Sequence, residues 1–262
     1  MIDLYTITYN EEFIAPFVLK YYDLLPIRKI VVYDNQSTDN TVKILKQHKK
    51  VEIREFDTNN TFDDVKHQIL KNQIWKESKG AVDWVCVSDF DEVLYSENIQ
   101  QYLDLLKSQK IDILDTPGIE FICEKISTNY DILLHKQKYM KFNFYEKAHL
   151  NRKKLLFNPN TIKDINFTAG QHFLFPKKYD NSPIKYGLCN SIYMFHLKFL
   201  TLKYILNRHH MYVKRFSENN KKYKLGIHYT VEDEQQKKDF LNRLKTSSTF
   251  EECCKQSHIS ND

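Results

Sequence analysis

The clearest chemical signal in the chain is the run Ser-Asp-Phe-Asp-Glu at residues 88–92, directly after the apolar run at 84–87. Asp89 and Asp91 stand two positions apart where a buried strand is expected to end, so both carboxylates can point toward one ligand. Paired carboxylate oxygens suit Mg²⁺ or Mn²⁺, and such a cation would hold a diphosphate through its remaining coordination sites. A turn with solvated acids is the alternative interpretation.

Two more polar clusters follow short apolar runs. Residues 9–12 read Tyr-Asn-Glu-Glu, and residues 34–40 read Asp-Asn-Gln-Ser-Thr-Asp-Asn. Helix capping alone would explain residues 37–39. Taken together with residues 88–92, however, the clusters predict one acidic site at one edge of a sheet, because ligands bind beyond the carboxyl ends of parallel strands.

The amino-acid composition argues against several classes of function. The five glycines are scattered, which excludes a Walker A loop and a G-x-G-x-x-G dinucleotide fingerprint. The net charge of +5 comes from interspersed acids and bases, so no nucleic-acid partner is expected. The five cysteines show no metal-ligand spacing and no apolar run approaches a membrane span, which predicts a reduced, cytoplasmic protein. Basic residues near 214–224 could add peripheral contact with the inner face of a membrane.

The elements that must position these clusters alternate regularly over residues 1–95. Strands are expected at 4–8, 29–33, 51–56 and 84–87, with helices at 11–25, near 42–45 and at 61–79. This rhythm predicts an α/β fold, a Rossmann-like, mostly parallel central sheet with helices on both faces.

The rhythm loosens after residue 95. A helix at 99–106, strands at 111–114 and 119–123, an irregular stretch at 125–190, a helix late in 192–217 and a helix at 231–244 before a tail are expected. The simplest organisation is a domain at 1–215, with a nucleotide-binding half at 1–95 and an acceptor-side half at 96–215. A C-terminal helical appendage at 216–262 follows.

The runs at 8–12, 32–41 and 83–92 resemble the GT-A glycosyltransferases of the family 2 type. The resemblance implies the GT-A nucleotide-diphospho-sugar transferase fold and a D-x-D-E motif. It further implies that Asp34 accepts a hydrogen bond from the base, that Asp89 meets the ribose or the metal, and that Asp91 ligates the metal. The other residues that it places at the nucleotide-sugar are Thr8, Asn10, Glu12, Asn35, Ser37 and Phe90.

Weaker matches occur later in the chain. Residues 153–159, then 170–172, then 196–198 resemble the pattern K-x-I-x-x-P, G-x-H and H of a bacterial surface-polysaccharide subgroup of these enzymes. By this resemblance Lys154 neutralises a phosphate, His172 is a late metal ligand, and His196 contacts the diphosphate or the acceptor. A histidine satisfied within a core is the alternative for both.

The catalytic base has no clear match, since the acidic pair that many inverting members carry is missing at the expected stretch. A base must be an acid or a histidine that faces the acceptor. Glu120, after Pro117 and Gly118, is our candidate, with Glu124 and Glu146 behind it.

The sequence thus predicts a metal-dependent inverting glycosyltransferase with Mn²⁺ or Mg²⁺ as cofactor. It would move a sugar from a nucleotide-diphosphate sugar, UDP-linked by preference, to a hydroxyl of a glycan or lipid-linked glycan, in the synthesis of capsular or other surface polysaccharide. A nucleotidyltransferase is the first alternative, although the glycine-rich basic loop that it needs after the first strand is missing. A glycan-binding module that uses its many aromatic rings is the second.

Overall fold

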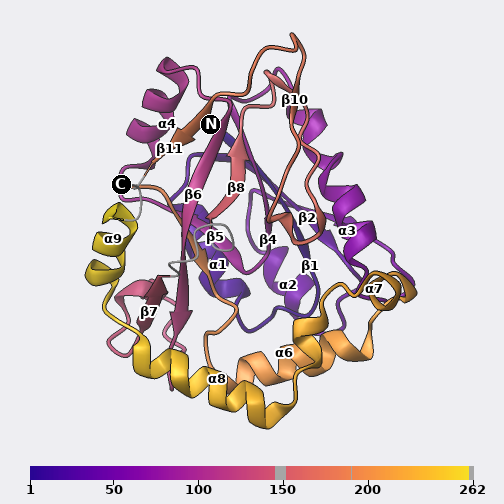
Figure 1. Ribbon diagram of the computed structural model, residues 1–262, viewed down its shortest axis with the longest axis vertical. Coiled ribbons are helices and arrows are strands. Elements are labelled where there is room, and N and C mark those ends of the chain that lie inside the picture. The colour runs from indigo at the N-terminus through magenta and orange to yellow at the C-terminus, as the bar shows by residue number, and fades with distance from the viewer. Residues whose placement is uncertain (145–151, 190, 260–262) are drawn as a thin grey trace.

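A computed structural model describes residues 1–144, 152–189 and 191–259. Its centre is a curled sheet of ten strands with the order β3-β2-β1-β4-β8-β6-β12-β5, to which β7 and β11 are joined by pairing with β6. Helices lie against both sides of this sheet (Figure 1). The predicted class, a mixed α/β Rossmann-like fold with a mostly parallel sheet, is confirmed.

The N-terminal part is the regular alternation that the sequence predicts. Strands β1 (Ile2–Thr8), β2 (Ile27–Asp34), β3 (Val51–Glu55) and β4 (Trp84–Asp89) are parallel. Helices α1 (Ala15–Asp23), α2 (Thr41–Leu45) and α3 (Asp64–Lys71) connect them. All four carboxyl ends therefore meet at one edge of the sheet.

Two cores, one on each side of the sheet, explain why these strands are buried throughout. Leu4 of β1 belongs to the core that α1 covers, and the next residue, Tyr5, belongs to the core under the 3-10 helix η1 (Ile74–Ser78). The same alternation holds along β2 and β4. A strand covered on both faces has no solvated side, so it reads as a continuous apolar run.

Two predicted helices are shorter than expected. The first starts at Ala15 rather than residue 11, and the long helix predicted at 61–79 is divided. The side chain of Asp63 caps the start of α3 by accepting from the backbone N–H groups of Val65 and Lys66, as N-cap carboxylates do. After α3 ends at Lys71, the chain turns into η1, which places Trp75 in the second core.

The second half contains β5 (Glu92–Tyr95), α4 (Ile99–Ser108) and β6 (Ile113–Ile122). The two strands predicted at 111–114 and 119–123 are one strand, which keeps its pairing with β8 across a register shift between Leu114 and Thr116. The stretch predicted to be irregular holds two 3-10 turns, η2 (Leu134–Lys136) and η3 (Ala169–Gln171), and short strands. The strands are β7 (Lys141–Phe144), β8 (Arg152–Phe157), β9 (Ile162–Asp164), β10 (Lys177–Lys178) and β11 (Tyr186–Leu188).

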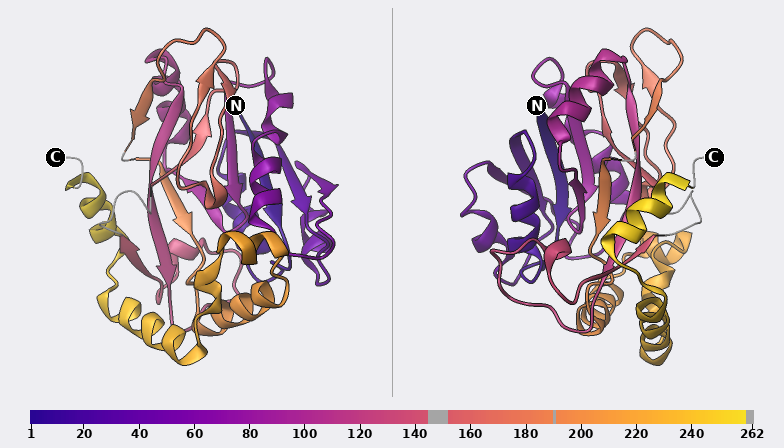
Figure 2. Two further views of the ribbon diagram at one scale, coloured as in Figure 1. Left: turned by 45° about the vertical axis from the view of Figure 1, so that its right-hand side comes forward. Right: turned by 90° about the vertical axis from the view of Figure 1, so that its left-hand side faces the viewer.

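After β12 (Tyr193–His196), the chain is helical. Helices α6 (Leu202–Lys214) and α8 (Asp233–Thr246) cross one end of the sheet, with α7 (Glu218–Tyr223) and the 3-10 helix η4 (Ile227–Thr230) between them (Figure 2). The predicted tail contains a further helix, α9 (Phe250–Ile259), because Phe250 packs on the aromatic cluster around Phe195. Within the described ranges, no helix is long and apolar enough to cross a membrane.

Candidate functional site

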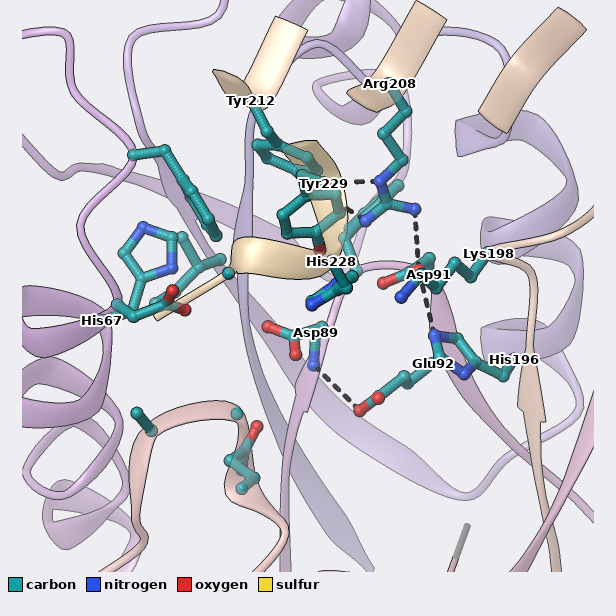
Figure 3. A pocket seen from close by; sticks show the side chains of 18 of the residues that line it. His67, Asp89, Asp91, Glu92, His196, Lys198, Arg208, Tyr212, His228 and Tyr229 are labelled. Carbon is teal, nitrogen blue, oxygen red and sulfur yellow. Dashed lines mark hydrogen bonds and ion pairs between the residues drawn. The ribbon is translucent and has the colours of Figure 1, made fainter. Parts of the chain in front are cut away.

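A cavity of about 550 Å³, here called cavity A, lies at the carboxyl ends of β1 and β4. Side chains from α3, η3, β12, α6 and η4 close its other sides, and Figure 3 shows part of the lining. Six acids and six Lys or Arg side chains are among the described residues that line it. The chemistry of the cavity therefore depends on which of these charges neutralise one another.

Asp89 ends β4 and lies between two lysines. The ammonium of Lys71 donates to its Oδ1 at 2.5 Å, and Lys153 lies 3.9 Å from its Oδ2. Burial opposes the charged carboxylate, but the two lysines outweigh it and lower the pKa of Asp89 to about 2. Asp89 is thus an anion at every physiological pH.

Asp91 sits deeper, under the guanidinium of Arg208 from α6. Arg208 donates to Oδ2 of Asp91 at 2.7 Å, and Nε2 of His196 lies 3.3 Å from the same oxygen (Figure 3). Burial again opposes ionisation, but Arg208 and His196 hold the pKa of Asp91 well below its usual range. The carboxyl of Glu11 shares Arg208 at 3.3 Å, yet burial dominates there and raises the pKa of Glu11 to about 7.

Two further acid–base pairs complete a row across the sheet. Strand pairing sets His196 beside both Glu92 of β5 and Glu120 of β6. Lys153 donates to Glu92, and Arg243 of α8 donates to Glu120 at 2.6 Å. We call Asp89, Asp91, Glu92 and Glu120 the carboxylate row, and each of its members has a basic partner.

Two cations of cavity A have no carboxylate partner in the described part of the chain. Among the residues that the structure describes, no carboxylate lies within 4.0 Å of Lys198 or Arg215. Burial lowers the pKa of Lys198 to about 8, with the nearby Arg208 acting in the same direction. Arg215 stacks on Tyr9 with 3.2 Å between its guanidinium carbon and the ring centre, and its Nη1 is buried with no hydrogen-bond acceptor in the described chain.

Three histidines of cavity A, His67, His172 and His228, are neutral at physiological pH. Burial is the first cause that lowers the pKa of His67 and His172 to about 4, and of His228 to about 3. Nδ1 of His172 is buried and, in the described part of the chain, has no partner. A neutral imidazole can donate one hydrogen bond and accept another, or ligate a metal.

The structure brings eight of the predicted site residues together at cavity A and leaves five outside its lining. The eight are Thr8, Asn35, Asp89, Phe90, Asp91, Glu120, His172 and His196. The five are Asn10, Glu12, Asp34, Ser37 and Lys154. Glu124, the second choice of base, is exposed, and Glu146 lies outside the described residues.

Asn10, Glu12 and Ser37 tie the first two strand-end loops together. Asn10 accepts from the backbone N–H of Thr38 at 2.7 Å, Glu12 accepts from that of Asn40 at 2.9 Å, and Ser37 accepts from that of Asn10 at 3.0 Å. These contacts hold the loop that carries Asn35 in place. Asp34 accepts from the N–H of Ser37 with Oδ2, while its Oδ1 is buried with no donor among the described groups.

Lys154 lies on the far side of β8. Its ammonium is 3.3 Å from Asp115, whereas the preceding residue, Lys153, lines cavity A and binds the carboxylate row. Successive side chains of a strand point to opposite faces, so the structure gives Lys153 the position that the sequence analysis gave to Lys154.

Several lining residues were missed in the sequence: Lys71, Lys198, Arg208, Arg215 and Tyr229. A signal existed for one of them. Tyr204, Arg208 and Tyr212 are spaced by four, so they share one face of a helix, and both tyrosine hydroxyls contact Arg208 in the structure. An arginine between two aromatic residues on a buried helical face needs an anionic partner.

The residues predicted to hold a metal do not fit a divalent cation as they are arranged here. Asp89 and Asp91 are engaged by lysine, arginine and histidine. Across residues 1–144, 152–189 and 191–259, no group of three or more His, Cys, Asp or Glu side chains could hold a metal ion. A cation would first have to displace Lys71 from Asp89.

Comparison with known proteins gives one family. The model described as Glycosyltransferase family 92 matches residues 6–244. No curated protein matches the chain.

Among solved structures, the crystal structure of S. aureus TarS is 14% identical, with a TM-score of 0.45 over 94% of this chain. This chain spans only 43% of that TarS chain. TarS 1–349 in complex with UDP-GlcNAc is 12% identical, with a TM-score of 0.45 over 95% of this chain and 74% of that one.

Proposed function

This chain belongs to glycosyltransferase family 92, and we propose on that basis that it transfers a sugar from a nucleotide-diphosphate sugar to a hydroxyl of a glycan. The glycosyltransferase class predicted from the sequence is confirmed, with family 92 where the resemblance gave family 2. The observation that carries the proposal is the pair of cations without carboxylates in cavity A, Lys198 and Arg215. Arg215 is buried and Lys198 is half-buried. Cations that are removed from water are normally paired, so these two favour an anionic ligand such as a diphosphate.

The nucleoside would occupy the corner formed by Tyr9, Asn35 and Arg215, at the ends of β1 and β2. Arg215 donates to the side-chain oxygen of Asn35 at 2.8 Å and covers the ring of Tyr9. Oγ1 of Thr8 is buried there with no partner in the described chain. Asp34 remains the predicted contact of the base, and a UDP-linked donor remains the preferred one.

Glu120 is our proposed base. It lines cavity A, and burial raises its pKa although Arg243 acts against that shift. A raised pKa improves a carboxylate as a proton acceptor near neutral pH. The acceptor oxygen would form a bond to the anomeric carbon while the bond from that carbon to the diphosphate oxygen breaks. The hydroxyl proton would pass to Glu120, and the configuration would invert.

Mn²⁺ or Mg²⁺ remains a prediction from the sequence. If one binds, it would first have to displace the basic side chains that now hold Asp89 and Asp91. The two carboxylates would then supply oxygen ligands and His172 a nitrogen ligand, and the metal would neutralise charge on the diphosphate. The role in surface polysaccharide and the contact with a membrane likewise remain predictions.

A panel of ligands tests the proposal directly. Thermal unfolding is measured with UDP, GDP, UDP-GlcNAc, UDP-glucose and UDP-galactose, each with Mn²⁺ or with EDTA. We expect a uridine ligand at a hundred times its Kd to stabilise the fold by about 2.7 kcal/mol, and donor hydrolysis to follow. A chain that binds no member of the panel contradicts the proposal, and pyrophosphate release from UTP would support the nucleotidyltransferase instead. Equal binding and hydrolysis in EDTA would overturn the predicted metal.

A further inference from the structure

A second cavity of about 840 Å³, here called cavity B, adjoins cavity A. The two share one wall, made of Lys198, Phe199, His228 and Arg243. The remainder of cavity B comes from β7, α6, α8 and the segment that leads into α9. Neither the sequence patterns nor the donor assignment above uses this cavity.

The lining of cavity B combines aromatic rings and uncharged hydrogen-bonding groups with three charged side chains, Lys198, Asp239 and Arg243. The rings belong to Phe142, Phe144 and Phe199. The amide and hydroxyl groups belong to Asn143, Gln236, Asn242, Thr246 and Ser248. Rings that cover the apolar face of a ligand, together with a few polar groups that fix its orientation, are the usual composition of a small-molecule site, and they match the two kinds of surface that a sugar ring presents.

His209 supplies a second, independent observation. Its side chain lines cavity B and is only 3% exposed, yet neither ring nitrogen has a hydrogen-bond partner among the described residues. Buried polar groups without partners are rare and need an explanation. Burial lowers the pKa of His209 to about 4, so the neutral ring offers one donor and one acceptor. A ligand hydroxyl could satisfy the ring nitrogen that it reaches, whichever of the two that is, because a hydroxyl both donates and accepts.

Contacts across the shared wall connect cavity B to the proposed base. Arg243 lines both cavities and donates to Glu120 at 2.6 Å. Asn143 pairs with Glu120 in the β6–β7 register, and its side-chain amide donates to the carbonyl of Arg243 at 3.3 Å. A hydroxyl that enters from cavity B would therefore approach Glu120 at this wall.

We propose that cavity B is the acceptor site and that it binds an uncharged sugar residue. The ring would pack on the phenylalanines, with His209 at one hydroxyl and another hydroxyl directed past Arg243 toward Glu120. This assignment rests on the proposed transferase function, and it places acceptor recognition on α8 and β7 rather than on the strand ends that hold the donor.

The test fills cavity B from the exposed face of α8. The variant Asn242→Leu/Thr246→Leu removes two polar groups from the lining and adds aliphatic bulk, while both positions are exposed and tolerate leucine in a helix. The matched control, Lys238→Leu/Lys245→Leu, changes two exposed positions of the same helix that line neither cavity. The probes are p-nitrophenyl β-glucoside, β-galactoside and N-acetyl-β-glucosaminide, observed by saturation-transfer NMR with and without UDP.

We expect at least one glycoside to bind the wild type and the control, and its affinity to fall more than tenfold in the cavity B variant, with UDP affinity unchanged. Equal glycoside binding in both variants would overturn the proposal, as would a wild type that binds none of the three probes. A chain that binds glycosides in cavity B but no nucleotide would contradict the transferase and leave the sugar site standing, so the two failures are distinguishable.

Discussion

The carboxylate row and the corner around Arg215 differ in whether their charges are neutralised by oppositely charged groups of the described chain. Each acid of the row has a basic partner within the chain. Arg215 is held by neutral groups, the ring of Tyr9 and the side-chain oxygen of Asn35. A region with paired charges is organised before any ligand arrives, whereas a region with an unpaired buried cation gains its partner from the ligand. The row should therefore govern the rate, and the corner should govern donor affinity.

Removal of the charge of Glu120 should separate these roles most clearly. Glu120→Gln keeps the shape of the side chain but can no longer take a proton. We expect kcat for transfer to a p-nitrophenyl glycoside, or to water, to fall by a factor of about 10²–10⁴, the usual contribution of a general base. Titration calorimetry should give an unchanged Kd for UDP.

Glu124→Gln is the matched control for that variant, because Glu124 is exposed just beyond the same strand. Its activity should equal that of the wild type. If Glu120→Gln keeps more than a third of the wild-type kcat, the base lies elsewhere and the row has only a structural role.

Loss of the guanidinium at the corner should have a smaller effect, on affinity. In Arg215→Met the ligand loses one charged hydrogen-bonding partner, a loss of about 1.5–3 kcal/mol, so the Kd for UDP should rise roughly tenfold to a hundredfold. The kcat at saturating donor should change less than threefold. Lys214→Met, at the exposed neighbouring position, should leave both unchanged. A variant at Arg215 that lowered kcat and spared Kd would reverse the assignment of the two regions.

The same contrast explains what the sequence could predict. The strand ends that carry Asp89, Asp91 and Asn35 follow from apolar runs and their polar termini, which are local patterns. The partners of those residues do not follow, because Arg208 lies 117 residues from Asp91 along the chain and Arg215 lies 180 residues from Asn35. Long-range ion pairs depend on how helices pack, and periodicity says nothing of that.

Local errors have physical causes too. The sequence pattern places Lys154 at the phosphate, whereas Lys153 is the lysine that lines cavity A. On a strand, a shift of one residue moves a side chain to the opposite face of the sheet. Residues 216–262 were set apart as an appendage, yet His228, Tyr229 and Arg243 line cavity A. Polar helices give no sequence signal for an inward-facing site residue, and the boundary after residue 215 remains a prediction.

Lys198 should have the smallest effect, a change of UDP affinity with pH. In the described chain it is a cation with no carboxylate partner, and it lies close to the carboxylate row. Its pKa is lowered to about 8, so the ammonium is charged below pH 8 and neutral above it. UDP affinity should therefore fall about tenfold between pH 7 and pH 9, as the site loses its proton. The unfolded chain holds that proton up to about pH 10.4, so the stability of the ligand-free protein should rise with pH over the same interval.

Two variants at Lys198 test the pH dependence of UDP affinity. Lys198→Met should lose this dependence and Lys198→Arg should keep the high affinity to pH 9, with calorimetry at each pH as the measurement. Any titration of the nucleotide itself would appear equally in Lys198→Met, so a wild type whose pH dependence matches that variant would show that Lys198 does not meet the diphosphate.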